Sequence, residues 1–323
     1  MGNWIGDGRA AATLLVLLIA TVLALAIGWL GSFHALFETV TNVRLQVAVI
    51  SLAPLVGFLF LRRWQLAAVA FLVAAIYWIP LAGYVTASPD PVTSGTEVTR
   101  VMQYNIFFKN EDFRAIVDHI EASDADVVAI HELLPHQWDG LEPLLDEYPY
   151  RIAEPLAEAD GEPGGGMALL ARAPLTRVAV DPSTSPIDRV TLAATIEIAN
   201  KEVLVVGLHP HASRTDSVKV ELRERQLAGV AALAGDVDMP AIVIADLNVT
   251  PTSPVYDDFL DDLGWRDPHR LVGWHSSWPT WGAPFGMPID HVFVSNEIAL
   301  HGYETGDGAG SDHRSVVATI SLR

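Results

Sequence analysis

The sequence predicts an α+β protein in which an N-terminal region of membrane-spanning helices precedes one globular domain. Half of the 323 residues are hydrophobic, and the excess lies at the N-terminal end. Residues 86–97, rich in proline, serine and threonine, are typical of a linker. Beyond them, strand-like and helix-like patterns alternate over about 225 residues, which is enough for one sizeable core. These observations divide the chain into a helical region, 1–85, a linker, 86–97, and a globular domain, 98–323.

Three uncharged segments of the helical region are predicted to cross a membrane. They are residues 10–31, 45–61 and 66–85, and they contain 22, 17 and 20 residues. A helix needs about 20 apolar residues to cross the hydrocarbon core, with a lower limit of about 17, so the second segment is the shortest that suffices. A cleaved signal peptide would explain the first segment but not the other two.

Basic residues predict the orientation of these segments. Arg62 and Arg63 occupy the turn between the second and third segments, and Arg9 precedes the first. Cytoplasmic loops favour Lys and Arg, so this end is predicted to be cytoplasmic. Arg44, at the opposite end, argues weakly against this orientation. We therefore expect a multi-pass protein of the cell membrane whose globular domain lies outside the cytoplasm.

The globular part of the chain is strongly acidic. Residues 1–89 hold four of the 20 basic and two of the 39 acidic residues, which leaves 16 basic and 37 acidic residues and a net charge of −21. Such a surface repels nucleic acid and anionic lipid head groups, so nucleic acid is a disfavoured partner, although weak metal-bridged contacts leave it open. The chain has no cysteine, which excludes disulfides and thiolate ligands.

The globular domain shows two kinds of periodicity. Eight stretches rich in β-branched and aromatic residues predict strands, and four have the apolar spacing of helices. Many strands with few helices between them fit two architectures: two packed sheets with helices outside, or a doubly wound α/β sheet. The predicted strands are 98–108, 126–132, 166–172, 189–198, 201–209, 241–248, 289–295 and 314–322, and the predicted helices are 111–122, 136–147, 216–235 and 254–263.

Polar residues recur at the ends of these predicted strands. Singly, each has a structural explanation, such as a turn, a helix cap or a satisfied histidine. Together they indicate a site, because strand ends on one sheet edge converge and clefts form there. Residues i and i+2 of a strand lie on one face, so Asp246 and Asn248 are predicted to share a face. The full set is Asn105, Glu132, His209, Asp246, Asn248, Asp290, Asp312 and His313.

The chemistry of this set indicates hydrolysis of a phosphate ester with a divalent metal. It offers carboxylates, amides, imidazoles and no thiol, and oxygen ligands suit Mg²⁺, Mn²⁺ or Ca²⁺. A metal and an imidazolium together stabilise the charge that develops on phosphoryl oxygens. His211 forms an H-x-H pair with His209, which leaves a transition-metal site open, but the intervening Pro210 and the shortage of other ligands argue against it.

The order of the short motifs YNI, IHE, GLH, ADLN, IDHVFVS and SDHRS resembles the endonuclease/exonuclease/phosphatase (DNase I-like) superfamily. That superfamily includes nucleases, neutral sphingomyelinases and inositol-polyphosphate 5-phosphatases. The resemblance covers residues 98–323 and implies a four-layer α/β/β/α sandwich. His131 stands where the superfamily commonly has glutamine, and Ala245 and Leu247 stand where it commonly has glycine and phenylalanine.

The resemblance also implies a role for each polar residue. Glu132 corresponds to the principal Mg²⁺ ligand. Asn105 corresponds to the asparagine that helps hold metal and phosphate. Asp290 corresponds to the aspartate that supports the metal site or a catalytic histidine.

The other five residues correspond to catalytic positions. His209 corresponds to the histidine that contacts the scissile phosphate, and Asn248 to the asparagine that holds phosphate. Asp246 corresponds to the aspartate that orients or deprotonates the attacking water. Asp312 and His313 correspond to a terminal pair in which the aspartate polarises the histidine, and the histidine binds phosphate or acts as an acid–base group.

We therefore expect a membrane-anchored, Mg²⁺-dependent phosphoesterase that hydrolyses a phosphodiester or phosphomonoester, with a lipid-linked ester among the candidates. Two alternatives stay open. One is a nuclease that acts on DNA or RNA outside the cytoplasm. The other is a non-catalytic membrane protein that binds a ligand on the same scaffold. A binuclear metallophosphoesterase is disfavoured because its G-N-H stretch is absent from the sequence.

Overall fold

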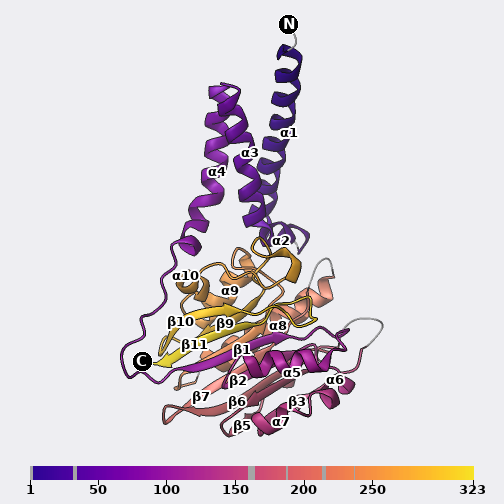
Figure 1. Cartoon of the computed structure of the whole chain (residues 1–323), viewed down its shortest axis with the longest axis vertical. Coiled ribbons are helices and arrows are strands. Elements are labelled where there is room, and N and C mark those ends of the chain that lie inside the picture. The colour runs from indigo at the N-terminus through magenta and orange to yellow at the C-terminus, as the bar shows by residue number, and fades with distance from the viewer. Residues whose placement is uncertain (1–2, 32–34, 159–163, 187, 213–215, 236) are drawn as a thin grey trace.

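The molecule consists of a helical stalk that stands on a globular domain built from two sheets (Figure 1). The N-terminus lies at the far tip of the stalk, and the C-terminus lies in the globular domain. The structure, a computed structural model, describes residues 3–31, 35–158, 164–186, 188–212, 216–235 and 237–323.

The stalk is formed by helices α1, α3 and α4, and the short helix α2 lies at its base (Figure 1). Buried apolar side chains of these helices, including Phe58 and Tyr77, pack into one cluster. Two of the helices, at 8–29 and 64–85, are long and apolar enough to cross a membrane, whereas α3 is a shorter apolar helix of 17 residues. The bounds are α1 Asn3–Trp29, α2 Ala35–Asn42, α3 Arg44–Phe60 and α4 Trp64–Val85.

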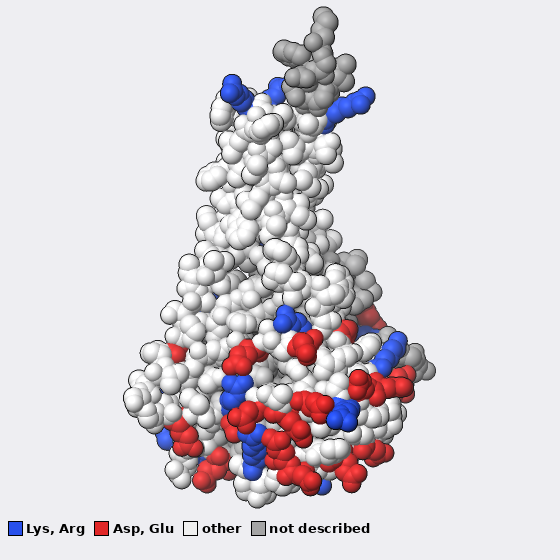
Figure 2. All heavy atoms as spheres, viewed as in Figure 1, with Lys and Arg blue, Asp and Glu red and all other residues white. Residues whose placement is uncertain are grey.

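Charged side chains are distributed very unevenly over the molecule. Figure 2 shows Lys and Arg at the far end of the stalk, an uncharged surface along it, and many Asp and Glu on the globular domain. This is the pattern expected of a segment that lies in hydrocarbon between two aqueous phases. The number of spans and the orientation remain predictions.

Eleven strands of the described residues form two sheets. The six-stranded sheet has the order β10-β11-β1-β2-β4-β3, and the five-stranded sheet has the order β5-β6-β7-β8-β9. The bounds are β1 Thr99–Asn105, β2 Val127–His131, β3 Tyr150–Glu154, β4 Met167–Ala171, β5 Leu175–Val178, β6 Thr191–Ile198, β7 Lys201–Leu208, β8 Ala241–Asp246, β9 Asp290–Val294, β10 Ile298–Thr305 and β11 Val316–Leu322.

The two sheets pack face to face, with helices on both outer faces. Buried residues of both sheets, such as Val127 and Ile244, form the central cluster. The outer face of the five-stranded sheet is covered by α8 and α9, and that of the six-stranded sheet by α5 to α7. This is the four-layer α/β/β/α sandwich, and the doubly wound alternative is wrong. The bounds are α5 Phe113–Ala122, α6 Pro135–Gly140, α7 Leu144–Glu147, α8 Ser217–Gly235, α9 Pro254–Leu263 and α10 Pro268–Val272, with 3₁₀ turns at Pro182–Thr184 and Thr280–Gly282.

The register of the strands brings the predicted site residues to one edge of the sandwich. β1 and β2 are parallel, and Asn105 pairs with His131 at their ends. β8 runs antiparallel to β9, and its last residue, Asp246, pairs with the first residue of β9, Asp290. Because the carboxyl ends of β1, β2 and β8 are followed by loops at the same edge, side chains far apart in sequence converge there.

A buried ion pair joins the base of the stalk to the globular domain. The guanidinium of Arg223, on α8, donates two hydrogen bonds to the carboxylate of Glu38, on α2, at 2.8 and 2.9 Å. Both side chains are buried. The two parallel bonds hold the planar guanidinium in a fixed geometry, as is typical of Arg–carboxylate contacts.

Glu38→Gln is expected to destabilise the full-length protein by ~3–5 kcal/mol, because loss of one partner leaves the buried charge of Arg223 unpaired. The free energy of unfolding in detergent measures this effect. Glu221→Gln, which breaks an exposed pair with Arg225, is the matched control and should cost at most about 1 kcal/mol. Equal stability of the two variants would contradict a structural role for the buried pair.

Two further contacts connect the stalk to the loop that follows β8. The side-chain oxygen of Asn42 accepts hydrogen bonds from Thr250, from its backbone N at 2.9 Å and from its hydroxyl at 3.3 Å. The hydroxyl of Thr252 donates to the Thr41 carbonyl at 2.6 Å. The loop that carries Asn248 is therefore held directly by the helical region.

The predicted linker is also fixed to the globular domain. The backbone N of Asp90 donates to the Leu300 carbonyl at 2.9 Å. Its carboxylate accepts from Arg266 at 2.9 Å and from Arg323 at 2.7 Å, and the Arg266 hydrogen bond is the main reason that the pKa of Asp90 falls to about 2. Residues near Asp90 therefore lie along the edge strand β10 and do not form a free tether.

Candidate active site

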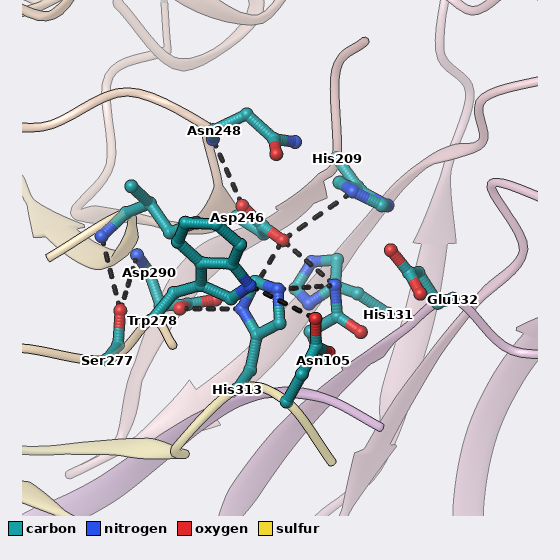
Figure 3. Close-up of polar contacts among 12 residues, drawn as sticks. Asn105, His131, Glu132, His209, Asp246, Asn248, Ser277, Trp278, Asp290 and His313 are labelled. Atoms are coloured by element: carbon teal, nitrogen blue, oxygen red, sulfur yellow. Dashed lines mark hydrogen bonds and ion pairs between the residues drawn. The ribbon is translucent and has the colours of Figure 1, made fainter. Parts of the chain in front are cut away.

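The centre of the site is a buried group of two carboxylates and one imidazole. Within the described ranges, Asp246, Asp290 and His313 offer side-chain atoms that lie within 4.8 Å of one another. Nδ1 of His313 lies 2.9 Å from Oδ2 of Asp290 and 3.8 Å from Oδ2 of Asp246 (Figure 3). Both carboxylates are at most 1 % exposed, so these charges interact with little screening by water.

The charges of this group determine its protonation. Burial alone would lower the pKa of His313, but the carboxylates of Asp290 and Asp246 raise it to about 10. Burial and repulsion from Asp290 raise the pKa of Asp246 to about 7. Burial would raise the pKa of Asp290 too, yet the positive His313 holds it below its usual value. At neutral pH, Asp290 and His313 therefore form a buried ion pair beside a carboxyl group that takes up a proton easily.

Asp246 is held in place by three neighbours. Its Oδ1 accepts a hydrogen bond from the backbone N of Asn248 at 3.0 Å, and its Oδ2 accepts from Nδ2 of Asn105 at 2.9 Å. Nε2 of His209 lies 3.6 Å from the same Oδ2 (Figure 3). The carboxylate is thus oriented from both sides, and its second oxygen faces the imidazole of His209.

The amide of Asn105 can be oriented from its contacts. Its Oδ1 accepts a hydrogen bond from the backbone N of Phe107 at 2.9 Å, so Nδ2 faces Asp246 and His313. Nε2 of His313 lies 3.5 Å from this Nδ2. When His313 is protonated, both atoms are donors and cannot bond to each other. The Nε2–H of His313 is therefore available to a substrate oxygen.

His209 is present as a neutral imidazole. It is 2 % exposed, and burial holds its pKa well below the usual value. Its Nδ1 has no hydrogen-bond partner among the described residues. A buried ring nitrogen without a partner costs free energy, and a ligand that bonded to it would remove that cost.

Glu132 directly follows β2 and adopts a positive φ of 60°. Its Oε2 accepts a hydrogen bond from the backbone N of Phe108 at 3.2 Å, and a hydrogen bond from Asn105 also stabilises its charged form. Burial nevertheless dominates and raises the pKa of Glu132. Figure 3 places its carboxylate on the side of Asn105 away from Asp290. A strained backbone at this position is typical of a functional residue.

The predicted partner of His313 is wrong. Asp290, not Asp312, binds its Nδ1, because the strand β9 places Asp290 directly against the imidazole. The Asp312 carboxylate instead accepts a hydrogen bond from Nε1 of Trp278 at 3.0 Å. The side chains of neighbouring residues in a turn point in different directions, so Asp312 does not contact the imidazole of His313 although the two residues are adjacent in the sequence.

The predicted shared face of Asp246 and Asn248 is also wrong. β8 ends at Asp246, and Asn248 adopts a φ of 57°, so strand alternation does not extend to it. The Asn248 backbone N caps the Asp246 carboxylate, while its side chain donates to the Pro210 carbonyl at 3.3 Å. Asn248 therefore lies beside the site because a turn, and not the strand β8, places it there.

His211 does not join the central group. Its Nε2 lies 3.2 Å from a carboxylate oxygen of Asp188, and no metal-ligand group of the described residues includes it. His211 therefore lies outside the central group, and its side chain faces Asp188.

Several site residues were not found from the sequence. Nε2 of Gln103 donates to Oδ1 of Asp290 at 2.6 Å and contacts Nδ1 of His131 at 3.3 Å. Ser277 accepts a hydrogen bond from the backbone N of Asp290 at 3.3 Å. The signal for Gln103 was available, because it precedes Asn105 by two residues on the same face of β1. Ser277 and Trp278 lie in a long loop and had no such signal.

The donor set fits a divalent cation. Asp246 and Asp290 bring two carboxylates so close that repulsion raises the pKa of one of them, and a bound cation would relieve this repulsion. Glu132 and the second lone pair of the Asn105 carbonyl oxygen offer further oxygen ligands. His313 fits less well, because its Nδ1 carries the proton shared with Asp290. The residues that would hold the cation are therefore oxygen donors, as Mg²⁺ prefers.

Carboxylates, amides and imidazoles from several strands and loops therefore meet at one edge of the four-layer sandwich. The sequence profile of the Endonuclease/Exonuclease/phosphatase family matches residues 102–313, so the chain belongs to this family. A search among curated proteins finds no match.

Solved structures share the fold of the globular domain. An endonuclease/exonuclease/phosphatase protein from Beutenbergia cavernae is 24% identical, with a TM-score of 0.56 over 70% of this chain and 72% of that one. Sphingomyelinase C from Streptomyces griseocarneus is 20% identical, with a TM-score of 0.51 over 69% and 99%. A beta toxin double mutant from Staphylococcus aureus, solved with bound magnesium ions, is 18% identical, with a TM-score of 0.52 over 70% and 100%.

Proposed function

We propose that this protein is a membrane-anchored phosphoesterase that uses a divalent cation, with Mg²⁺ as the first choice, to hydrolyse a phosphate ester. The observation that carries the proposal is the buried Asp290–His313 ion pair beside Asp246, whose carboxyl takes up a proton near neutral pH. One acid, one base and a cluster of oxygen ligands are the groups that phosphate-ester hydrolysis requires.

Asp246 is the group that accepts the proton of the attacking water. Asn105 and the backbone of Asn248 fix its two oxygens, so the carboxylate is oriented before the substrate arrives. A pKa near the working pH favours proton transfer in both directions. The bound cation would supply positive charge to the phosphoryl oxygens, and Glu132 with Asp290 and Asn105 would hold it.

The two histidines have different tasks because their charges differ. His313, kept positive by Asp290, presents its Nε2–H to a phosphoryl or leaving-group oxygen. A charge-assisted hydrogen bond of this kind is roughly twice as strong as a neutral one. His209 is neutral, so it orients the substrate by a hydrogen bond and does not add charge.

Hydrolysis of bis(p-nitrophenyl) phosphate, sphingomyelin, phosphatidylinositol phosphates and DNA, with and without EDTA, tests the proposal. We expect turnover of at least one phosphate ester that EDTA abolishes and added Mg²⁺ restores. Turnover of DNA alone would favour the nuclease alternative. Binding without turnover of any substrate would favour a non-catalytic scaffold.

Stabilisation by Mg²⁺ is expected to increase with pH through about 7. The pKa of Asp246 is raised in the folded state, so as pH rises from about 4 to about 7 this group makes the metal-free protein less stable. A cation competes with that proton, and its stabilising effect therefore grows over this range. The rise in Tm caused by saturating Mg²⁺ should be larger at about pH 8 than at about pH 5.

Asp246→Asn is the control for this pH dependence, because it removes the titrating group. An increment in Tm that does not change with pH in the unmodified protein would contradict a cation bound beside Asp246.

Glu132→Gln is expected to raise the Mg²⁺ concentration required for half-maximal activity while the fold stays intact. The substitution removes one negative oxygen ligand and keeps the side-chain shape. The increase should be at least the ~10–100-fold that loss of an outer metal contact costs. Glu142→Gln, an exposed carboxylate near α6, is the control. An unchanged Mg²⁺ requirement would remove Glu132 from the metal site.

A further inference from the structure

One loop of this acidic domain has no charged residue. Residues 273–289, which connect α10 to β9, contain no Asp, Glu, Lys or Arg. Two large aromatic side chains of this loop are exposed: Trp281 at 87% and Phe285 at 58%. Among the described residues of 98–323, no other Trp or Phe side chain is exposed. Uncharged, exposed aromatic residues of this kind indicate a surface that meets an apolar partner.

The same loop is fixed to the base of the stalk. Nε2 of Gln46, near the start of α3, donates to the Phe285 carbonyl at 2.6 Å. Trp274 packs on the stalk cluster, where its ring meets Tyr84 of α4 edge-on at 6.1 Å. Its Nε1 donates to the Gly286 carbonyl at 3.2 Å. Figure 1 shows α10, which precedes the loop, beside the lower end of α4.

The other side of the loop forms part of the active site. Trp278 donates to the Asp312 carboxylate, and the backbone N of Thr280 donates to the Asp312 carbonyl at 2.9 Å. The Trp278 ring lies 6.5 Å from the ring of His313. One continuous segment therefore connects the catalytic imidazole, two exposed aromatic side chains and the end of a helix that is long enough to cross a membrane.

We propose that the loop 274–287 docks into the head-group region of a lipid bilayer and holds the mouth of the active site against it. The occupant is a lipid surface because the loop is continuous with the apolar stalk and lies at the level where α4 ends. Trp and other aromatic residues favour this boundary, where an apolar ring and a polar edge are both satisfied. The acidic remainder of the domain stays in water.

This docking has a consequence for the substrate, which rests on the proposed phosphoesterase function. A site held at the head-group level meets phosphate esters that are attached to lipids, whereas polymers in solution must approach past an acidic surface. The substrate class is therefore a phosphate ester whose alcohol part is a membrane lipid.

A single fluorescent label tests the docking without any activity measurement. The chain has no cysteine, so Trp281→Cys accepts one environment-sensitive dye at one place. Tyr150→Cys, on β3 and 40% exposed, is the matched control. In vesicles of phosphatidylcholine, we expect quenchers attached to the lipid head-group region to quench the dye at 281 and not at 150.

Two results would overturn the docking. One is equal, weak lipid quenching at both positions. The other is a dye at 281 that the lipid-attached quenchers do not reach and that is protected from iodide, a quencher dissolved in water, only at high protein density. That result would identify a second copy of the protein as the occupant.

An activity measurement tests the substrate class separately. The double variant Trp281→Ala and Phe285→Ala is assayed on a vesicle-embedded phosphodiester and on bis(p-nitrophenyl) phosphate. The ratio of the first rate to the second is expected to fall roughly tenfold or more. An unchanged ratio would refute the lipid substrate. If the unmodified protein hydrolyses neither substrate, the proposed function fails, while the label still decides the docking.

Discussion

Asp246→Asn is expected to lower kcat/KM on an activated phosphodiester by ~10²–10⁴, the usual contribution of a general base. Asn keeps the shape of the side chain but cannot accept the proton of water. Its oxygen can still accept a hydrogen bond from Asn105 or from the backbone N of Asn248, but not from both. Steady-state kinetics at saturating Mg²⁺ measures the loss.

Asp258→Asn is the matched control for this variant. It makes the same chemical change on the exposed face of α9, and its rate should equal that of the unmodified protein. The Tm of both variants separates lost chemistry from lost folding. A rate near that of the unmodified protein for Asp246→Asn would show that another group activates the water.

His313→Ala is the second variant with a large expected effect. It removes the positively charged donor that faces the substrate and leaves the Asp290 carboxylate buried without its partner. Loss of one donor to a developing oxyanion costs ~10²–10³ in kcat. His136→Ala, an exposed histidine on α6, is the control. A rate for His313→Ala similar to that of His136→Ala would contradict the assignment.

The double variant tests whether the two groups act together. If Asp246 and His313 serve one transition state, the double variant should lose less, in log rate, than the two single variants added together. Strictly additive losses would place the two groups in separate steps.

Eight of the eleven described strands were predicted because they carry strong local patterns, whereas the sandwich was preferred over a doubly wound sheet because of the family resemblance. The run that ends at Asp246 and the run that starts at Asp290 both form strands at those residues. The strands β3, β5 and β10 were not predicted. All three are edge strands of their sheets, and neither β3 nor β5 contains a buried residue, so the apolar pattern of these two strands is weaker.

The site was less predictable than the fold because its contacts are tertiary. The positions of the polar residues followed from strand ends, and the structure brings them to one edge. The identity of each partner did not follow. Asp290 lies 23 residues from His313 in the sequence, and yet Asp290, and not the adjacent Asp312, is the hydrogen-bond partner of the His313 imidazole. The turn at Asn248 requires a positive φ, which side-chain alternation cannot indicate.

In addition to the covalent linker, hydrogen bonds hold the globular domain to the stalk, namely those of Asn42 with Thr250 and of Glu38 with Arg223. They determine whether the domain would be released when the linker is cleaved. A protease that cut residues 86–97 would sever the chain but not these hydrogen bonds, nor those of Asp90. A fragment that begins at residue 98 would carry an uncovered arginine in a former interface and a β8 loop without its support. Cleavage alone is therefore expected to leave the globular domain bound to the stalk, and a domain freed from the stalk is expected to be less stable than the full-length protein.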